Sequence, residues 1–248
     1  MEPSELGLNL RTLTLIAHKL RTPLSIINGY SEAILAQAEK EKFSPFTTKA
    51  MDEINQQGGH LALLIDKLAA FNKVMAADKD SLEKRPIVLK KLLNDCAAKA
   101  LMLEEGRAIT PTKEETAAVK RGIQVDIDCP PNTVINGNEE MLRLCIQELL
   151  ANAIKFNNKM EKIIKVQAAN HGNSISVSVR DYGVGIRPQD VARLFEPFYQ
   201  VDDDFTGQIN GWGVGLSMVQ RIADLHNGMV SVVSDRGLGS IFTVKFSF

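Results

Sequence analysis

The sequence predicts a helical hairpin followed by an α+β domain. Residues 8–80 contain no convincing strand pattern, and their apolar residues recur at alternating spacings of four and three, which is typical of packed helices. After a charged stretch that ends at Pro86, short alternating strands are mixed with helices, as in α+β proteins. The 248 residues are therefore expected to form two domains, residues 8–80 and 81–248.

Two apolar seams define the first domain, and a polar break around residues 43–48 separates them. The first seam consists of Leu13, Ala17, Leu20, Leu24, Ile27, Ser31 and Ile34, and the second of Ile54, Leu61, Leu64, Leu68, Phe71 and Met75. Two helices joined by a short connection make an antiparallel hairpin, which cannot cover its apolar faces on both sides. We expect a second copy to complete a four-helix bundle. The alternative is that the hairpin packs only on the rest of its own chain.

The second domain is predicted to alternate between helices and short strands. Helices are expected over residues 90–105, 139–157, 191–195 and 216–226. Strands are expected over residues 87–89, 123–129, 163–169, 174–180, 229–234 and 241–248. A turn at residues 171–173 should join two of these strands into a hairpin, and a turn at 235–239 should join the last two.

The composition excludes several classes of protein. The net charge is −1, whereas a dedicated nucleic-acid-binding protein normally carries a basic excess. No apolar run reaches the roughly 18 residues that a membrane helix needs. The three cysteines stand apart, which indicates a reducing compartment and small buried side chains. We therefore expect a cytoplasmic protein, or the cytoplasmic part of a longer receptor.

Among the four histidines, His18 has the most distinctive setting. It lies beside the first apolar seam, so it can reach solvent, and Thr22 follows one helical turn later on the same face. Pro23 removes a backbone hydrogen bond and favours a bend there. The other three histidines are interpreted as structural, surface or capping residues: His60, His171 and His226. A histidine at the surface of a helix, taken alone, needs no function.

Three glycine clusters lie in the second domain, at residues 181–186, 211–216 and 237–240. Glycine lets the backbone approach a ligand closely, and a glycine loop that leads into a helix offers free N–H groups to a phosphate. Any one cluster is weak evidence, because glycines are also frequent in simple turns.

One predicted helix carries Glu148, Asn152 and Lys155 on a single face, while the apolar residues between them turn inward. Carboxylate and amide oxygens suit Mg²⁺, and an ammonium group suits a phosphate. This face could therefore bind a magnesium polyphosphate. The alternative is an ordinary solvated polar face.

Taken together and in this order, these motifs resemble those of the bacterial two-component sensor histidine kinases. The resemblance extends from about residue 8 to residue 248. The matching segments are an H box at 18–24, an N box at 148–156, glycine boxes at the three clusters and an F box at 194–199. A single box would be weak evidence, but six in the correct order are specific.

The resemblance implies a two-layer α/β sandwich that binds ATP, and a phosphoacceptor at His18. Thr22 would hold the water that hydrolyses a regulator's aspartyl phosphate, so phosphatase activity is also expected. Glu148, which is also a candidate catalytic residue, and Asn152 would bind Mg²⁺. The implied nucleotide-binding residues are Asn152, Lys155, Phe156, Asp181, Gly183, Gly185, Gly211, Gly213, Gly215 and Leu216. The implied partners are a second copy of the chain, a response-regulator receiver domain and a separate sensor protein.

The sequence departs from the family pattern at Lys19, Asn138 and the bulky Trp212, and the segment around residues 104–120 is longer than usual. Lys19 stands where the family normally has a carboxylate beside the histidine, and Asn138 stands where an aspartate is common. A charged lysine cannot accept a proton, which leaves open an ATP-binding control module with weak kinase activity that acts mainly as a phosphatase or scaffold. A different ATPase with the same pocket, such as a chaperone-like protein, is a third hypothesis, against which the H-box hairpin argues.

Overall fold

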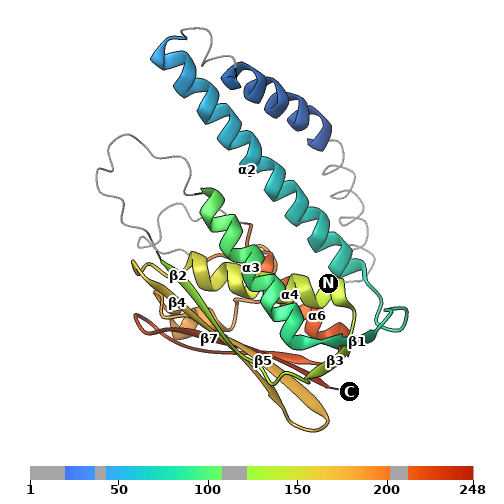
Figure 1. The fold of residues 1–248 in the computed structure, drawn as a ribbon. Helices are drawn as coiled ribbons and strands as arrows, with labels where there is room; N and C mark the ends of the chain where they lie inside the picture. Colours follow the sequence, from blue (N-terminus) through green and yellow to red (C-terminus); the bar gives the residue numbers. More distant parts are fainter. Residues whose placement is uncertain (1–19, 37–42, 108–121, 202–211, 248) are drawn as a thin grey trace. The chain divides into compact units, whose positions relative to one another are not determined.

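A computed structural model describes residues 20–36, 43–107, 122–201 and 212–247. These residues belong to two compact units, Met1–Ala76 and Ala77–Phe248. The first is helical and the second mixes helices with a β-sheet (Figure 1), so the predicted fold class is confirmed. Within the described residues, no helix is long and apolar enough to span a membrane.

The first unit contains a helix over residues 20–36 and the long helix α2 (Pro45–Ala76). Helix α2 begins inside the predicted polar break, because Ser44 and Pro45 form a helix start. The Ser44 hydroxyl accepts a hydrogen bond from the main-chain N–H of Thr47 at 3.1 Å, and proline is well suited to the first helical position.

Leu24 and Ile65 form a buried contact between these two helices, with Ala62 packed against it. The helices also approach closely at Gly58, where an added Cβ would lie 1.8 Å from Asn28 Oδ1. The seam prediction is only partly reproduced. Of its described members, the clearly buried ones are Leu24, Ser31, Leu68 and Phe71, whereas Leu20, Ile27, Ile54 and Leu61 remain exposed.

A five-stranded sheet in the order β2-β4-β5-β7-β6 forms one layer of the second unit. Its strands are β2 (Ile123–Asp128), β4 (Lys162–Asn170), β5 (Ser174–Arg180), β6 (Met229–Asp235) and β7 (Gly239–Ser247). Only the β2–β4 pair is parallel, with Ile123 opposite Lys162. The β4–β5 hairpin turns at Gly172, as expected, with a φ of 83° that favours glycine.

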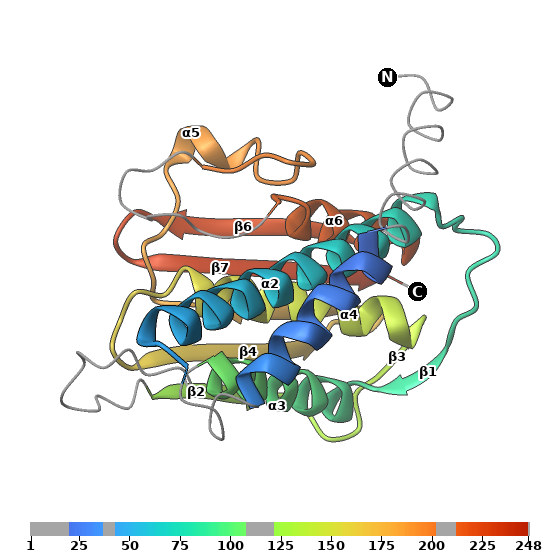
Figure 2. The ribbon, with the colours of Figure 1, turned by 90° about the horizontal axis from the view of Figure 1, so that it is seen from above.

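Helices form the other layer and cover one face of this sheet (Figures 1 and 2). They are α3 (Leu89–Arg107), α4 (Glu139–Lys155) and α6 (Gly215–Leu225). The core between the layers includes Leu92, Ile146, Leu150, Ile222, Ile164, Val177 and Val244, all of which are at most 2% exposed. The three cysteines are free and buried, as the sequence indicated. The result is a two-layer sandwich.

Two elements differ from the sequence-based expectation. Strand β3 (Val134–Gly137) was not predicted, and it pairs with β1 (Arg85–Val88) in a separate antiparallel ribbon. The helix expected at residues 191–195 is instead α5 (Pro188–Val191), followed by turns. Proline favours the first turn of a helix, so Pro188 starts α5 earlier than the apolar pattern suggested.

Candidate functional site

Helix α4 carries the predicted polar face, and the exposure of its three polar side chains increases along the helix. Glu148 is 8% exposed, Asn152 is half-buried and Lys155 is exposed, with its ammonium 5.0 Å from the centre of the Phe156 ring. The residues between them, Leu149, Leu150 and Ala153, are buried in the core. Because the Glu148 side chain is buried, the alternative of an ordinary solvated polar face does not account for it. The face offers two oxygen-bearing side chains followed by a cation.

The first glycine cluster packs directly against the end of this helix. The main-chain N–H of Val184 donates to the carbonyl of Phe156 at 3.1 Å. A Cβ added to Gly183 would lie 2.2 Å from the same carbonyl oxygen, so only glycine fits there without a shift. The loop after β5 and the end of α4 therefore form one continuous surface.

Asp181 lies at the base of this loop and is 5% exposed. Its Oδ1 accepts a hydrogen bond from the main-chain N–H of Gly183 at 2.8 Å. Burial raises the pKa of the carboxyl group, although main-chain N–H groups of Gly183 and Ser240 oppose the shift. A buried carboxylate oriented in this way can accept a hydrogen bond from a ligand amino group.

The third glycine cluster supports the first from the sheet side. The carbonyl of Val184 accepts from the main-chain N–H of Gly237 at 2.8 Å. Added Cβ atoms would lie 2.0 Å from the Asp235 carbonyl oxygen at Gly185, and 2.2 Å from the Asp181 carbonyl oxygen at Gly239. Both glycines also have positive φ. The two clusters thus require glycine for close backbone packing.

The second glycine cluster leads into α6. Gly213 has a φ of 66°, and its carbonyl accepts from the main-chain N–H of Phe198 at 3.0 Å. Helix α6 starts at Gly215, is preceded by Val214 and has no side-chain hydrogen bond at its N-cap. Main-chain N–H groups at an uncapped helix start, with the positive end of the helix dipole, suit a phosphate.

A polar network that the sequence did not reveal supports this second cluster. The buried Asp190 carboxylate accepts from Arg187 Nε at 2.6 Å and from the Tyr199 hydroxyl at 3.0 Å. Arg193 lies over the Tyr199 ring at 4.3 Å and donates to Glu196. Arg187 holds the pKa of the Asp190 carboxyl below its usual value. This network therefore holds the predicted F box in place. In the sequence, only the helix start at Arg187 and Pro188 indicated such an arrangement.

The remaining predicted residues lie elsewhere. Thr22 is exposed on the helix over residues 20–36 in the first unit, while Leu216 is half-buried in the first turn of α6. His18 and Gly211 lie outside the described residues. Within the second unit, the structure thus brings the end of α4, the Asp181 loop and the third cluster together through direct contacts. The second cluster is connected to them through the packing of α6 on α4.

Another histidine proved more deeply placed than expected. His226 follows α6 as its C-cap and is 3% exposed, so it is a capping residue but not a surface one. Its Nε2 accepts from the main-chain N–H of Asn138 at 3.0 Å, which places the proton on Nδ1, 2.7 Å from the carbonyl of Ile222. The end of α6 is thereby joined to the start of α4.

Comparison with protein families gives two matches along the chain. Residues 9–76 match the His Kinase A (phospho-acceptor) domain. Residues 137–248 match the histidine kinase-, DNA gyrase B- and HSP90-like ATPase family. The order of these two domains is that of the predicted motifs. The chain belongs to the two-component sensor histidine kinases.

Related proteins align over nearly all of this chain. It is 29% identical to the phosphate regulon sensor protein PhoR of Pseudomonas aeruginosa over 94% of its length, which is 48% of that protein. It is 32% identical to the non-motile and phage-resistance protein of Caulobacter vibrioides, again over 94% of its length but over 26% of the relative. The chain thus spans half or less of the length of these relatives.

Solved structures of histidine kinases share the fold. Full-length ShkA in complex with AMPPNP superposes with a TM-score of 0.70 and 25% identity, covering 95% of this chain and 45% of that protein. The catalytic domain of the histidine kinase ThkA has a TM-score of 0.51 and 20% identity, covering 67% of this chain and 96% of that domain. The second likeness concerns the fold alone.

Proposed function

We propose that this sensor histidine kinase chain autophosphorylates His18 with ATP and transfers the phosphoryl group to an aspartate of a response regulator. Residues 8–80 would carry the phosphoacceptor and residues 81–248 would bind ATP. The observation that carries the proposal is the fixed contact between the Asp181 loop and the end of α4, where a buried carboxylate lies beside a helix with oxygen-bearing and cationic side chains.

The base of the nucleotide would lie against this loop. Asp181 would accept a hydrogen bond from the adenine amino group, and its low exposure supports that role because water competes poorly there. Gly183 and Gly185 keep the wall of the pocket free of side chains, and Phe156, which is 36% exposed, would border the purine.

The phosphates would lie between α4 and the start of α6. Lys155 would contact one phosphate, and the residues around the uncapped helix start would line the others: Gly211, Gly213, Gly215 and Leu216. Glu148 and Asn152 provide the oxygen donors that Mg²⁺ prefers, and the ion would neutralise phosphate charge when bound.

In the transfer step, a ring nitrogen of His18 would attack the γ-phosphorus of ATP. The N–P bond forms while the bond from phosphorus to the bridging oxygen breaks, and ADP leaves. An imidazole with an ordinary pKa near 6.5 is mostly neutral at pH 7 and is therefore a usable nucleophile. An aspartate oxygen of the regulator would then displace His18 from the phosphorus.

Thr22 would support the phosphatase activity, by which the regulator loses its phosphoryl group. Its side chain is exposed on a helix, and a hydroxyl can both donate to and accept from a water molecule. We propose that it orients the water that hydrolyses the aspartyl phosphate.

The proposed partners are a second copy of the chain, a receiver domain and a separate sensor protein. Exposed seam residues on the hairpin, including Ile27, Ile54 and Leu61, support pairing with a second copy. The use of ATP and the three buried free thiols support a cytoplasmic location. The near-neutral charge gives no support to nucleic-acid binding.

Incubation with γ-labelled ATP tests the proposal. We expect an acid-labile, base-stable phosphoprotein that disappears in His18→Gln, while the variant still binds ATP. A receiver domain added afterwards should take up the label. Label that persists in His18→Gln would place the phosphoacceptor at another residue. ATP binding with little or no label in the unaltered chain would favour the control-module hypothesis that Lys19 raises.

A further inference from the structure

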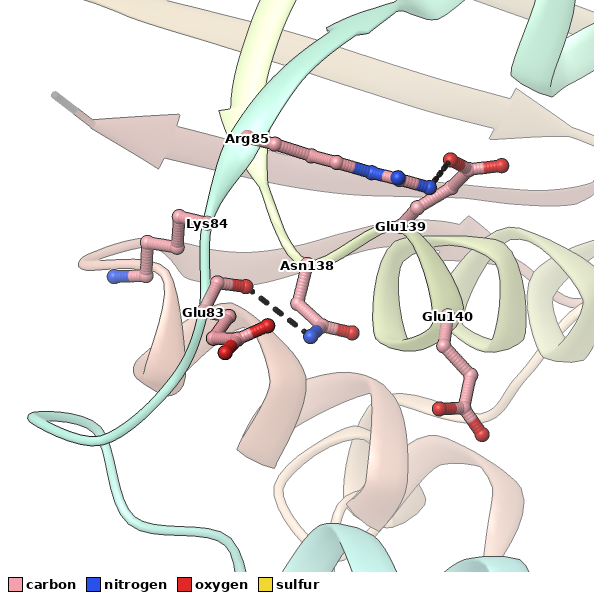
Figure 3. A pocket seen from close by; sticks show the side chains of 6 residues that line it. All are labelled: Glu83, Lys84, Arg85, Asn138, Glu139 and Glu140. Atoms are coloured by element: carbon pink, nitrogen blue, oxygen red, sulfur yellow. Dashed lines mark hydrogen bonds and ion pairs between the residues drawn. The ribbon is translucent and has the colours of Figure 1, made fainter.

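Asn138 joins three segments of the second unit through three different atoms. Its Oδ1 accepts from the main-chain N–H of Met141 at 3.1 Å and so caps α4. Its Nδ2 donates to the main-chain carbonyl of Glu83 at 3.2 Å, shown as a dashed line in Figure 3. Its own N–H donates to His226 at 3.0 Å. The residue thus contacts the segment before β1, the first turn of α4 and the end of α6.

The amide side chain of Asn138 makes both side-chain contacts through two different atoms. It carries an acceptor and a donor, whereas an ionised carboxylate only accepts. An aspartate at position 138 could still cap α4, but it would turn a second acceptor towards the Glu83 carbonyl. The asparagine that stands where the family commonly has aspartate therefore adds a contact to the cap.

The contact holds the last residues before β1 against the start of α4. Arg85 begins β1, pairs with Gly137 in the β1–β3 ribbon and forms an ion pair with Glu139. Glu139 in turn accepts from Arg143 at 2.9 Å. A cavity of about 430 Å³ opens here, lined by Glu83, Lys84, Arg85, Asn138, Glu139 and Glu140 (Figure 3). The residues of the Asn138–Glu83 hydrogen bond and those of the Arg85–Glu139 ion pair all line this cavity.

We propose that Asn138 is a positioning residue for autophosphorylation. Its amide nitrogen fixes the point at which the chain, coming from the hairpin unit, joins the helix that carries Glu148, Asn152 and Lys155. The proposal rests on the proposed kinase function. Since the contact lies at the first turn of α4 and the nucleotide-binding residues at its other end, releasing it should alter delivery of the phosphoryl group rather than ATP binding. Small misplacements of reacting groups can cost up to 10²-fold in rate.

Two substitutions separate this role from simple capping. Asn138→Asp and Asn138→Ser both keep a good N-cap but lose the Nδ2 donor. We expect each variant to remain folded, with a small fall in melting temperature from the lost contact. Each should bind ATP within about twofold of the wild type, a change of under 1 kcal/mol. The autophosphorylation kcat should fall by roughly three- to tenfold with an unchanged KM for ATP. Amide exchange over residues 78–84 should become faster, while the first turn of α4 stays protected.

Glu83→Ala is the matched control, because it removes a charge from the same cavity but leaves the main-chain acceptor in place. It should retain the wild-type kcat and exchange pattern. Wild-type kcat in both Asn138 variants, or a rise in KM that accounts for their loss, would overturn the positioning role. Unchanged exchange over residues 78–84 would show that the contact does not hold the segment. If the wild type transfers no phosphate, the proposed function fails, and the exchange measurement still decides whether the contact exists.

Discussion

At the scale of single residues, the environment of Asp181 would determine which base the proposed nucleotide pocket recognises. We predict that Asp181→Asn weakens ATP binding roughly ten- to hundredfold, because a hydrogen bond to a buried charged group contributes about 1.5–3 kcal/mol. The new amide can also turn a donor towards the base. Affinity for GTP, which has a carbonyl where adenine has the amino group, should therefore fall less or rise.

Calorimetric titration with both nucleotides measures this change. An equal loss for ATP and GTP would mean that Asp181 supports the loop through Gly183 without contacting the base. The chain's single tryptophan, Trp212, precedes Gly213 and would provide an independent fluorescence signal for binding at the proposed phosphate site.

Lys19 is the residue at which the chemistry of His18 departs most from the family pattern. Its charge disfavours the imidazolium form of His18, but it replaces the carboxylate that would orient the ring and accept its second proton. General-base assistance is worth about 10²–10⁴-fold, whereas an imidazole with an ordinary pKa near 6.5 is largely neutral at pH 8 with or without a neighbouring charge.

We therefore predict that Lys19→Glu raises the autophosphorylation rate at pH 8 by at least roughly tenfold, within the range of general-base assistance. ATP affinity should barely change. Single-turnover labelling at saturating ATP measures the rate. A slower reaction would contradict this account and would mean that Lys19 itself assists transfer or docks the regulator.

Residue types and spacing were sufficient to predict the face of α4 and the glycine loops, because helical periodicity and backbone permissiveness are local properties. The contact between Asn138 and His226 could not be predicted, since the two residues are 88 positions apart and neither has a distinctive neighbourhood in the sequence. In the network around Asp190, the Arg187 donor is local in sequence, whereas the Tyr199 donor comes from nine residues further on and could not be predicted from the pattern.

At the scale of elements, the loop after β5 depends on its fit to the end of α4. We predict that Gly183→Ala lowers both stability and ATP affinity, because its Cβ would lie 2.2 Å from the Phe156 carbonyl oxygen. Such overpacking typically costs about 1–3 kcal/mol. Gly122→Ala is the control, since a Cβ there meets nothing within 4 Å. Denaturant unfolding and nucleotide titration of both variants test the fit, and equal behaviour would contradict it.

The junction between α6 and α4 makes stability depend on pH. Burial lowers the pKa of His226 below its ordinary value near 6.5, and Lys84 contributes to the shift. As the pH falls below about 6.5, the unfolded state binds a proton on this histidine before the folded state does. The free energy of unfolding should therefore be highest above about pH 6.5 and decrease at more acidic pH. Protonated Nε2 would also face the Asn138 N–H as a second donor.

We predict that His226→Gln removes part of this acid sensitivity. Unfolding curves of the two proteins between about pH 5 and 8 measure it. If the free energy of unfolding depends on pH in the same way in both proteins, protonation of His226 is not coupled to unfolding and the acid dependence comes from other groups.

Elements also show where sequence patterns fail. The four residues of β3 contain only two buried positions, Ile135 and Gly137, which is too short a run to show alternation. Helix α5 starts earlier than expected because its start is set by Pro188 and by the ion pair between Arg187 and Asp190 rather than by an apolar stripe. The long helices and the β4–β5 hairpin were predicted correctly, since their patterns extend over several turns or end in a glycine turn.

At the scale of the whole molecule, the proposed reaction joins two units that fold around separate cores. The exposed seam residues of the hairpin belong to a stripe that continues on from the buried Leu24 and Leu68. A stripe of this kind favours a second copy as its cover, because each hairpin then supplies two helices of a four-helix bundle.

We predict that the chain sediments as a dimer at micromolar concentration and that Leu61→Asp shifts it towards the monomer. Leu61 is 41% exposed, and a carboxylate placed in an apolar interface without a partner costs several kcal/mol. Phe46→Asp is the matched control: Phe46 is more exposed, at 81%, but is not part of either seam. It should leave the dimer intact. Circular dichroism of both variants verifies that the helices persist. A wild-type chain that remains monomeric at all concentrations, or equal dissociation of both variants, would mean that the seam is not the dimer interface.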